Sequence, residues 1–158
     1  MKVGVTGHQE RKGIQWSWVE RTIHDELIKV AKVDKALSSL AAGTDQIFAK
    51  VAISLQIPVV AVLPIEGYER FFKGLALADY WKLLSQCELL QLTWTGNPDR
   101  SFLEAGKFIV DACDLLFAVW DGDIAAGLGG TGDVVSYAQQ SHRPIIHIDP
   151  CTELVYKI

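Results

Sequence analysis

The sequence predicts an α/β fold in which a mostly parallel sheet of about six strands is covered by helices on both faces. Short apolar runs alternate with amphipathic segments along the 158 residues, as in repeated strand–helix units. The run from Ile57 to Leu63 is apolar throughout, which is typical of a parallel strand buried on both faces. No linker, internal repeat or low-complexity tract divides the sequence, so we expect a single domain over residues 1–158.

The first half of the chain predicts three strands and two helices. Lys2 to Thr6 and Lys35 to Leu40 have the length and apolar content of strands. The segment from Ile14 to Ala31 between them is amphipathic with the helical period, and Thr44 to Gln56 follows the same pattern. Ile57 to Leu63 is the third strand, and a proline delimits each of its ends.

The second half repeats this alternation after a less regular stretch. Residues Ile65 to Phe72 are expected to form a loop or a single turn, and Thr95 to Asp99 has the composition of a turn. Ser101 and Glu104 have the spacing of a capping box, which predicts a helix from Ser101 to about Asp111. The other expected elements are the helices Leu75–Cys87 and Thr131–Ser141 and the strands Leu89–Thr93, Leu115–Trp120 and Pro144–Ile148.

Composition and charge limit the classes of function. With 49% hydrophobic and 22% charged residues, the sequence is that of a globular protein. Its apolar runs are too short to cross a membrane, and Met1 leads directly into a strand pattern without a signal peptide. We therefore expect a cytoplasmic protein with no membrane partner. The formal net charge of −4 and the lack of a dense lysine and arginine cluster predict no nucleic-acid partner.

Neither the cysteines nor the histidines predict a metal site. Cys87, Cys113 and Cys151 are widely spaced, as expected of reduced thiols in a cytosolic protein. The four histidines lack the spacing of zinc ligands. Asp121 and Asp123 flank one glycine, which is only a weak signal for a metal ion. We expect no metal and no required cofactor.

The glycine-rich segment from Asp121 to Asp133 is the strongest functional signal. It joins a predicted strand to a predicted helix, an arrangement that aims free backbone N–H groups and a helix N-terminus at an anion. Five glycines lie between Gly122 and Gly132, more than helix capping alone requires, so we favour a phosphate loop for a nucleotide-like ligand over a flexible loop. Thr131 is in place to cap the helix and to offer a hydroxyl. The phosphate-binding candidates are Gly129, Gly130 and Thr131.

Further candidates follow the first two strands, because parallel sheets bind ligands at the carboxyl ends of their strands. The candidates after the first strand are Thr6, Gly7, His8 and Arg11, and those after the second are Ser39, Gly43, Thr44 and Asp45. His8 and Arg11 are candidates for phosphate contacts, although an isolated histidine is more often a surface residue and a solvated arginine explains Arg11 equally well. Asp45 is a candidate for binding a sugar hydroxyl, but helix capping explains it slightly better.

Three residues near the glycine-rich segment have open roles. Trp120 is a candidate for stacking on a base, whereas a tryptophan beside a strand is more often part of the core. Asp121 is a candidate for holding a ribose. Asp133 either contacts the ligand or complements the helix dipole. A literal G-x-G-x-x-G match at Gly127, Gly129 and Gly132 follows the wrong strand for classical dinucleotide binding, which we do not expect.

Five segments in this order resemble the SLOG superfamily of Rossmann-like domains. That superfamily includes the LOG proteins, the DNA-processing Smf proteins and ligand-sensing domains. The likeness spans nearly the whole chain and implies a three-layer Rossmann-like fold, a pocket for a nucleotide or nucleotide-derived ligand, and a homodimer. The segments that carry it are Val3–His8, Ser38–Gln46, Val59–Pro64, Asp114–Gly122 and Gly129–Val135.

The resemblance leaves catalysis open. In LOG enzymes a P-G-G-x-G-T-x-x-E segment carries phosphate binding and a catalytic glutamate, and the products are a free base and ribose 5-phosphate. Gly130 and Thr131 match the G-T pair, but the glutamate position falls on Val134 and the leading proline is missing. We therefore favour a nucleotide-binding module, for example a sensor. The alternatives are a LOG-like phosphoribohydrolase using Asp45, Asp121 or Asp133, and a non-catalytic oligomeric scaffold with a vestigial pocket.

Overall fold

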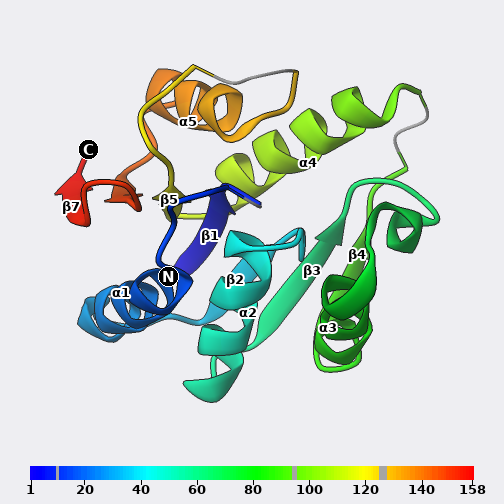
Figure 1. The fold of residues 1–158 in the computed structure, drawn as a ribbon, viewed down its shortest axis with the longest axis horizontal. Coiled ribbons are helices and arrows are strands. Elements are labelled where there is room, and N and C mark those ends of the chain that lie inside the picture. The colour runs from blue at the N-terminus through cyan, green and yellow to red at the C-terminus, as the bar shows by residue number, and fades with distance from the viewer. Residues whose placement is uncertain (10, 94–95, 125–127) are drawn as a thin grey trace.

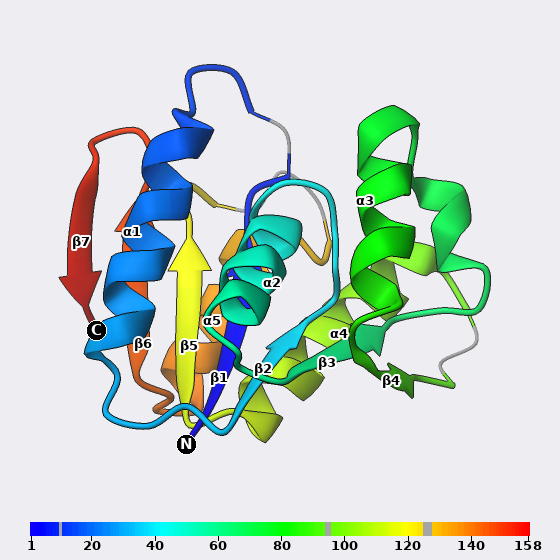
Figure 2. The same cartoon turned by 90° about the horizontal axis from the view of Figure 1, so that it is seen from below.

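A computed structural model of the chain describes residues 1–9, 11–93, 96–124 and 128–158. Within these ranges seven strands form one sheet in the order β4-β3-β2-β1-β5-β6-β7 (Figures 1 and 2). All neighbouring strands are parallel except β6 and β7, which are antiparallel. The strands are β1 Lys2–Gly7, β2 Lys35–Ser38, β3 Val59–Leu63, β4 Glu88–Gln91, β5 Leu115–Val119, β6 Ile145–Asp149 and β7 Leu154–Lys157.

Helices cover both faces of the sheet, as Figure 1 shows. Three of them, with a short 3₁₀ turn, pack on one face, and two pack on the other. The first group is α1 Trp16–Lys29, α2 Thr44–Ser54, the turn η1 Tyr68–Phe71 and α3 Gly74–Leu84, and the second is α4 Pro98–Ala112 and α5 Thr131–Gln140. No helix in the described ranges has the length and apolar character needed to cross a bilayer.

The buried strands contribute side chains to both layers, which explains their continuous apolar runs. In β5, Phe117 and Val119 belong to the core under α1 and α2, whereas Leu116 and Ala118 belong to the core under α4 and α5. This alternation follows from the period of two residues in a strand. The α/β class, the mostly parallel sheet and the two helical layers are therefore confirmed.

The order of the strands positions the site. β1 pairs with β2 on one side and with β5 on the other, and Gly7 is in register with Val119. The connection after β1 leads to one face of the sheet and the connection after β5 leads to the other. Such a switch point opens a crevice at the carboxyl ends of the two central strands.

Two local predictions need correction. α4 begins at Pro98, with the Asn97 side chain accepting the Asp99 N–H at 2.8 Å, so Ser101 lies inside the helix instead of capping it. The pair Asn97–Pro98 is the stronger start signal, because proline is favoured in the first helical turn. The sheet also has a seventh strand, β7, whose residues are all exposed and give no buried pattern.

Candidate functional site

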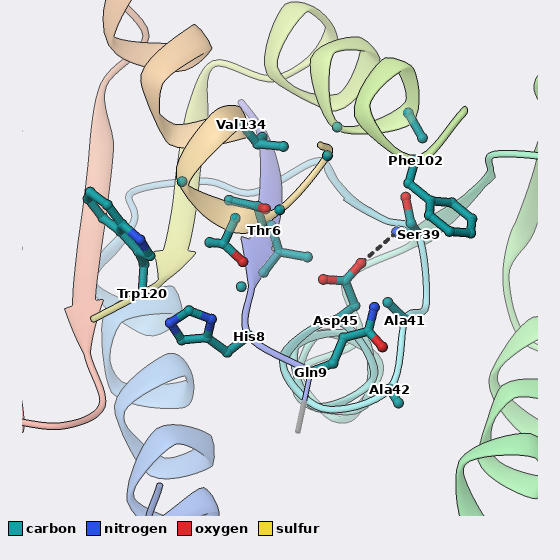
Figure 3. A pocket seen from close by; sticks show the side chains of 18 of the residues that line it. Thr6, His8, Gln9, Ser39, Ala41, Ala42, Asp45, Phe102, Trp120 and Val134 are labelled. Carbon is teal, nitrogen blue, oxygen red and sulfur yellow. Dashed lines mark hydrogen bonds between the residues drawn. The ribbon is translucent and has the colours of Figure 1, made fainter. Parts of the chain in front are cut away.

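An open cavity of about 880 Å³ lies at the carboxyl ends of β1 and β5. Its walls come from the segments after both strands, from the start of α2, from η1, and from the N-terminal parts of α4 and α5 (Figure 3). Of the predicted site residues, those that line it are Thr6, Gly7, His8, Arg11, Ser39, Asp45, Trp120, Asp121, Gly129, Gly130 and Thr131. Their ligand roles remain predictions.

Gly43 and Thr44 do not line the cavity, contrary to expectation. They pack against the backbone of the segment that follows β1. Thr44 is fully buried, and its N–H and its Oγ1 hydroxyl both donate to the His8 carbonyl oxygen, at 3.2 and 2.8 Å. Gly43 has a φ of +86°, and a Cβ there would lie 2.8 Å from the Gln9 carbonyl carbon. The start of α2 is therefore occupied by the segment that follows β1.

The start of α5 is open towards the cavity. Gly129 has a φ of +84°, and a Cβ at this position would lie 2.7 Å from the Asp99 carbonyl oxygen, so close packing on α4 requires glycine. The Gly129 N–H donates to Asp133 Oδ2 at 3.0 Å. The N–H groups of Gly130, Thr131 and Gly132 have no acceptor among the residues that the structure describes. They are available donors beside a helix N-terminus.

Two expectations for this loop change. The N-cap of α5 is Gly130, in an extended conformation, and no side chain among residues 1–9, 11–93, 96–124 and 128–158 caps the helix. Thr131 is therefore the first helical residue, and its hydroxyl has no capping role. Asp133 belongs to the first turn and binds the Gly129 N–H, which adds a carboxylate to the place where a phosphate was expected. Gly127 of the G-x-G-x-x-G match lies outside the described residues.

His8, Arg11 and Asp121 form an ion-paired cluster at the opposite rim. Asp121 Oδ1 lies 3.1 Å from His8 Nε2, and its Oδ2 contacts Arg11 Nη1. Arg11 Nη2 also lies 3.4 Å from Asp123 Oδ2. Burial alone would raise the pKa of Asp121, but the Asp123 N–H, His8 and Arg11 outweigh it and hold this pKa below its usual value. The Arg11 charge is thus compensated by two carboxylates.

Asp45 is the buried polar group of the cavity. Its side chain comes from the first turn of α2, and the residue is only 6% exposed. Oδ2 accepts the Ser39 N–H at 3.0 Å, and Figure 3 shows the other oxygen pointing into the cavity towards Thr6. Burial raises the pKa of Asp45 to about 7. Near neutral pH this group is therefore able both to donate and to accept a hydrogen bond.

An aromatic wall, which sequence reasoning missed, closes the side of the cavity away from Trp120. It consists of four aromatic residues on η1, its C-terminal end and α4, and the rings of Phe71 and Phe102 meet edge to face at 5.2 Å. The signal available was the presence of Phe71 and Phe72 in the connection that follows the third strand, at the edge where ligands bind. The aromatic wall is Tyr68, Phe71, Phe72 and Phe102. Gln9 and Asp99 also line the cavity and were not predicted.

Trp120 faces the cavity from the opposite side (Figure 3). Its Nε1 donates to the Asp123 carbonyl oxygen at 2.7 Å, and its ring lies 5.3 Å from the His147 ring. The His147 ring in turn lies 5.4 Å from that of Tyr156 on β7. The indole is therefore held in a fixed orientation by β6 and the loop after β5.

Catalytic and metal-binding groups are sparse at this site. Val134, in the position of the LOG glutamate, is buried and packs on Gly106 of α4. The Asp133 carboxylate points to the Gly129 N–H, and Asp121 is engaged by His8 and Arg11. In the described ranges no group of three histidine, cysteine or acidic side chains is arranged to hold a metal ion.

Comparison with known proteins identifies the fold. The sequence matches no protein-family model and no curated protein. The solved structure of DNA processing protein A (DprA) from Streptococcus pneumoniae is 17% identical, with a TM-score of 0.67, over 94% of this chain and 50% of that chain. DprA from Helicobacter pylori is 16% identical, with a TM-score of 0.63, over 94% of this chain and 65% of that chain.

A third similar structure is that of TM1055, at 14% identity and a TM-score of 0.59 over 92% of this chain and 72% of that chain. This chain therefore spans 50% and 65% of the two DprA chains. It shares the Rossmann-like fold of these structures, and the Rossmann-like fold that its sequence predicted is confirmed.

The exclusion of nucleic acids is wrong. The H. pylori structure is described as a single-stranded DNA binding mode of DprA, so a protein with this fold binds nucleic acid. Net charge averages over the whole surface, whereas a local array of N–H donors and aromatic rings can hold one or two nucleotides of a strand. The net charge of −4 therefore does not exclude such a partner.

Proposed function

We propose that this SLOG-type domain binds a nucleotide-like ligand in the cavity between β1 and β5. The observation that carries the proposal is the set of N–H groups of Gly130, Thr131 and Gly132, which lack acceptors among the described residues and belong to the cavity lining. Helix N-termini with free N–H groups bind phosphate through hydrogen bonds and the partial charge of the helix. The phosphate belongs at this end of the cavity.

The rest of the cavity supports a nucleoside attached to that phosphate. The aromatic wall offers edges and faces of Phe71 and Phe102 to a flat base, and Trp120 offers a second ring on the opposite side. Asp45 directs one carboxyl oxygen into the cavity, where it meets a ribose hydroxyl or a polar edge of the base. A volume of about 880 Å³ is ample for such a ligand.

A matched pair of variants tests the phosphate site. Thr131→Pro removes one N–H donor but keeps the helix, because proline suits the first helical position and Gly130 before it is extended, with ψ of 167°. Thr131→Ala keeps the N–H and removes only the hydroxyl. We expect Thr131→Pro to weaken nucleotide binding about tenfold, a loss of about 1.4 kcal/mol, and Thr131→Ala to weaken it by less than about threefold.

The measurement is a titration by calorimetry, with the melting temperature of each free variant as a check on folding. The ligands are AMP, ADP-ribose, NAD, a cyclic dinucleotide and a short single-stranded oligonucleotide. A ligand at about 100 times its dissociation constant stabilises by about 2.7 kcal/mol. If none of these ligands changes the melting temperature, the domain is not a nucleotide-binding module and the scaffold alternative gains support.

A strand of nucleic acid is a second candidate source of the nucleotide. It is favoured by the described single-stranded DNA binding of H. pylori DprA, which shares this fold. One nucleotide of such a strand would enter the cavity while its neighbours pass over the rim. Fluorescence anisotropy with a labelled oligonucleotide, repeated with Phe102→Ala, tests this, because loss of a stacking ring costs about 1–3 kcal/mol per base.

Hydrolysis of a nucleotide's N-glycosidic bond is supported less well. Asp121 and Asp133 are both engaged by the protein, so Asp45 is the remaining carboxylate of the three with an oxygen directed into the cavity. Release of adenine from AMP, measured by chromatography for the native protein and for Asp45→Asn, distinguishes an enzyme from a binding module.

A further inference from the structure

We propose that the cavity selects a phosphodiester, which carries one negative charge, over a terminal phosphate, and that Asp133 sets this selectivity. The inference rests on the proposed function, because it concerns the phosphate at the start of α5. It adds the chemical class of the ligand and names the residue that discriminates.

The first argument is that the cavity offers a phosphate no uncompensated cation. Arg11 is the one lysine or arginine among the described residues that line it. Both of its terminal nitrogens are already directed at carboxylates, Nη1 at Asp121 and Nη2 at Asp123. Asp45 and Asp99 add two more acidic groups to the lining. A phosphate must therefore be held by neutral N–H donors and by the helix terminus, which is equivalent to about half a positive charge.

The second argument is the place of Asp133. Its carboxylate binds the Gly129 N–H at 3.0 Å and so stays in the same turn as the N–H groups of Thr131 and Gly132, which have no acceptor in the described part of the chain. It repels any anion that binds there, in proportion to the charge of that anion. A terminal phosphate carries about −1.5 to −2 at neutral pH, whereas a phosphate esterified on both sides carries −1. The repulsion therefore falls mainly on the terminal phosphate.

Asp45 is a second polar feature of this cavity, separate from the start of α5. It is more than nine-tenths buried, and one of its carboxyl oxygens is directed into the open space (Figure 3), while the other accepts the Ser39 N–H. Ser38 and the Ala41 N–H also interact with this carboxyl group and partly offset its burial. A polar atom of a buried group that faces open space gains a further hydrogen bond from a ligand or water. The cavity thus offers the Asp45 carboxyl group to the nucleoside, in addition to the backbone N–H donors at the start of α5 for the phosphate oxygens.

The test compares AMP with its 5′-methyl phosphodiester, two ligands that share base and sugar and differ in one ester bond. Calorimetry on the native protein at pH 7.5 is expected to give at least tenfold tighter binding of the methyl ester. In Asp133→Asn the amide oxygen still accepts the Gly129 N–H, while the charge is gone. We expect this variant to narrow the ratio to about threefold or less, mainly by tightening AMP.

A control variant removes the same charge elsewhere. Asp25 is an exposed residue of α1 outside the cavity lining, so Asp25→Asn is expected to leave the ratio unchanged. AMP binding as tightly as the methyl ester, or an unchanged ratio in Asp133→Asn with a native melting temperature, would overturn the selectivity. Binding of neither ligand by any variant would instead reject the proposed function itself.

The source of the phosphodiester is resolved by two further ligands. One is a six-residue oligodeoxyadenylate without terminal phosphates, and the other is a cyclic diadenylate. Tighter binding of the oligodeoxyadenylate identifies the ligand as a strand of nucleic acid. Tighter binding of the cyclic diadenylate identifies it as a small cyclic nucleotide. If neither binds more tightly than AMP, the preference for a phosphodiester is overturned.

Discussion

The starts of α2 and α5 have similar sequences, but their N–H groups differ in whether the protein itself supplies an acceptor. Each helix follows a parallel strand, begins with a glycine and a threonine, and has an aspartate in its first turn. At α2 the chain itself supplies the acceptor, because Thr44 gives both its N–H and its hydroxyl to the His8 carbonyl oxygen. At α5 the N–H groups of Thr131 and Gly132 face the cavity with no described acceptor. Whether such a motif binds a ligand is decided by what lies in front of the helix.

Among the variants that test this comparison, we expect Gly43→Ala to have the largest effect on stability. The new Cβ would force a positive φ on an L residue and collide with the Gln9 backbone. We expect the free energy of unfolding to fall by about 3–5 kcal/mol, measured by urea denaturation. Gly13→Ala is the matched control, since Gly13 has a φ of +88° and no atom within 4 Å of the added Cβ. It should cost only about 1 kcal/mol, and equal losses in both variants would contradict the packing argument.

The next effect concerns Asp45, the aspartate in the first turn of α2. The folded protein binds a proton at Asp45 more tightly than the unfolded chain does, since the pKa rises from 3.8 to about 7. The contribution of this residue to stability is therefore full below about pH 4 and is lost as the pH rises towards 7. The variant Asp45→Asn keeps an acceptor for the Ser39 N–H but does not ionise. Relative to this variant, we expect the free energy of unfolding of the native protein to fall by roughly 2–4 kcal/mol as the pH rises across this range.

Urea denaturation of both proteins at pH 4.5, 6 and 8 gives this difference directly. A constant offset between the native protein and Asp45→Asn at all three pH values would show that Asp45 ionises normally in the folded state.

The smallest effect is expected from the two threonines. Thr44→Val removes a buried hydroxyl that donates at 2.8 Å and should cost about 1–2 kcal/mol. Thr131→Val removes a hydroxyl that makes no capping hydrogen bond to the described residues. The free energy of unfolding should change by no more than about 0.5 kcal/mol. Thermal unfolding of the two variants measures both. A larger loss at Thr131 than at Thr44 would reverse the assignment of the structural and the open helix start.

The fold was predictable because its signals are local. Continuous apolar runs such as Val59–Leu63 and amphipathic helices such as α1 specify buried parallel strands and their cover without knowledge of the rest of the chain. The sequence did not predict β7, because all of its residues are exposed and no buried pattern marks it. This strand is defined by its pairing with β6. The capping box at Ser101 misled because the spacing is correct, while the preceding Asn97 and Pro98 start the helix earlier.

The site was predictable only in outline. The rule that ligands bind at the carboxyl ends of parallel strands placed Thr6, Asp45 and Gly130 at one edge, and the structure gathers them around one cavity. Sequence could not show that Thr44 would be buried while Thr131 stays accessible, because the two motifs carry the same residues. Nor could it show that Arg11 pairs with Asp121, since that contact joins segments far apart in the chain.

The central position of β1 has a consequence for biosynthesis. This first strand gains its two neighbours at very different times, because β2 follows closely in the chain whereas β5 emerges only after α4. While the ribosome is still producing the earlier helices, one long edge of β1 stays bare and the Arg11 partner has not been made. The hollow at the sheet edge therefore exists only after most of the polypeptide has been synthesised, and nascent or truncated forms that stop before β5 have no means of forming it.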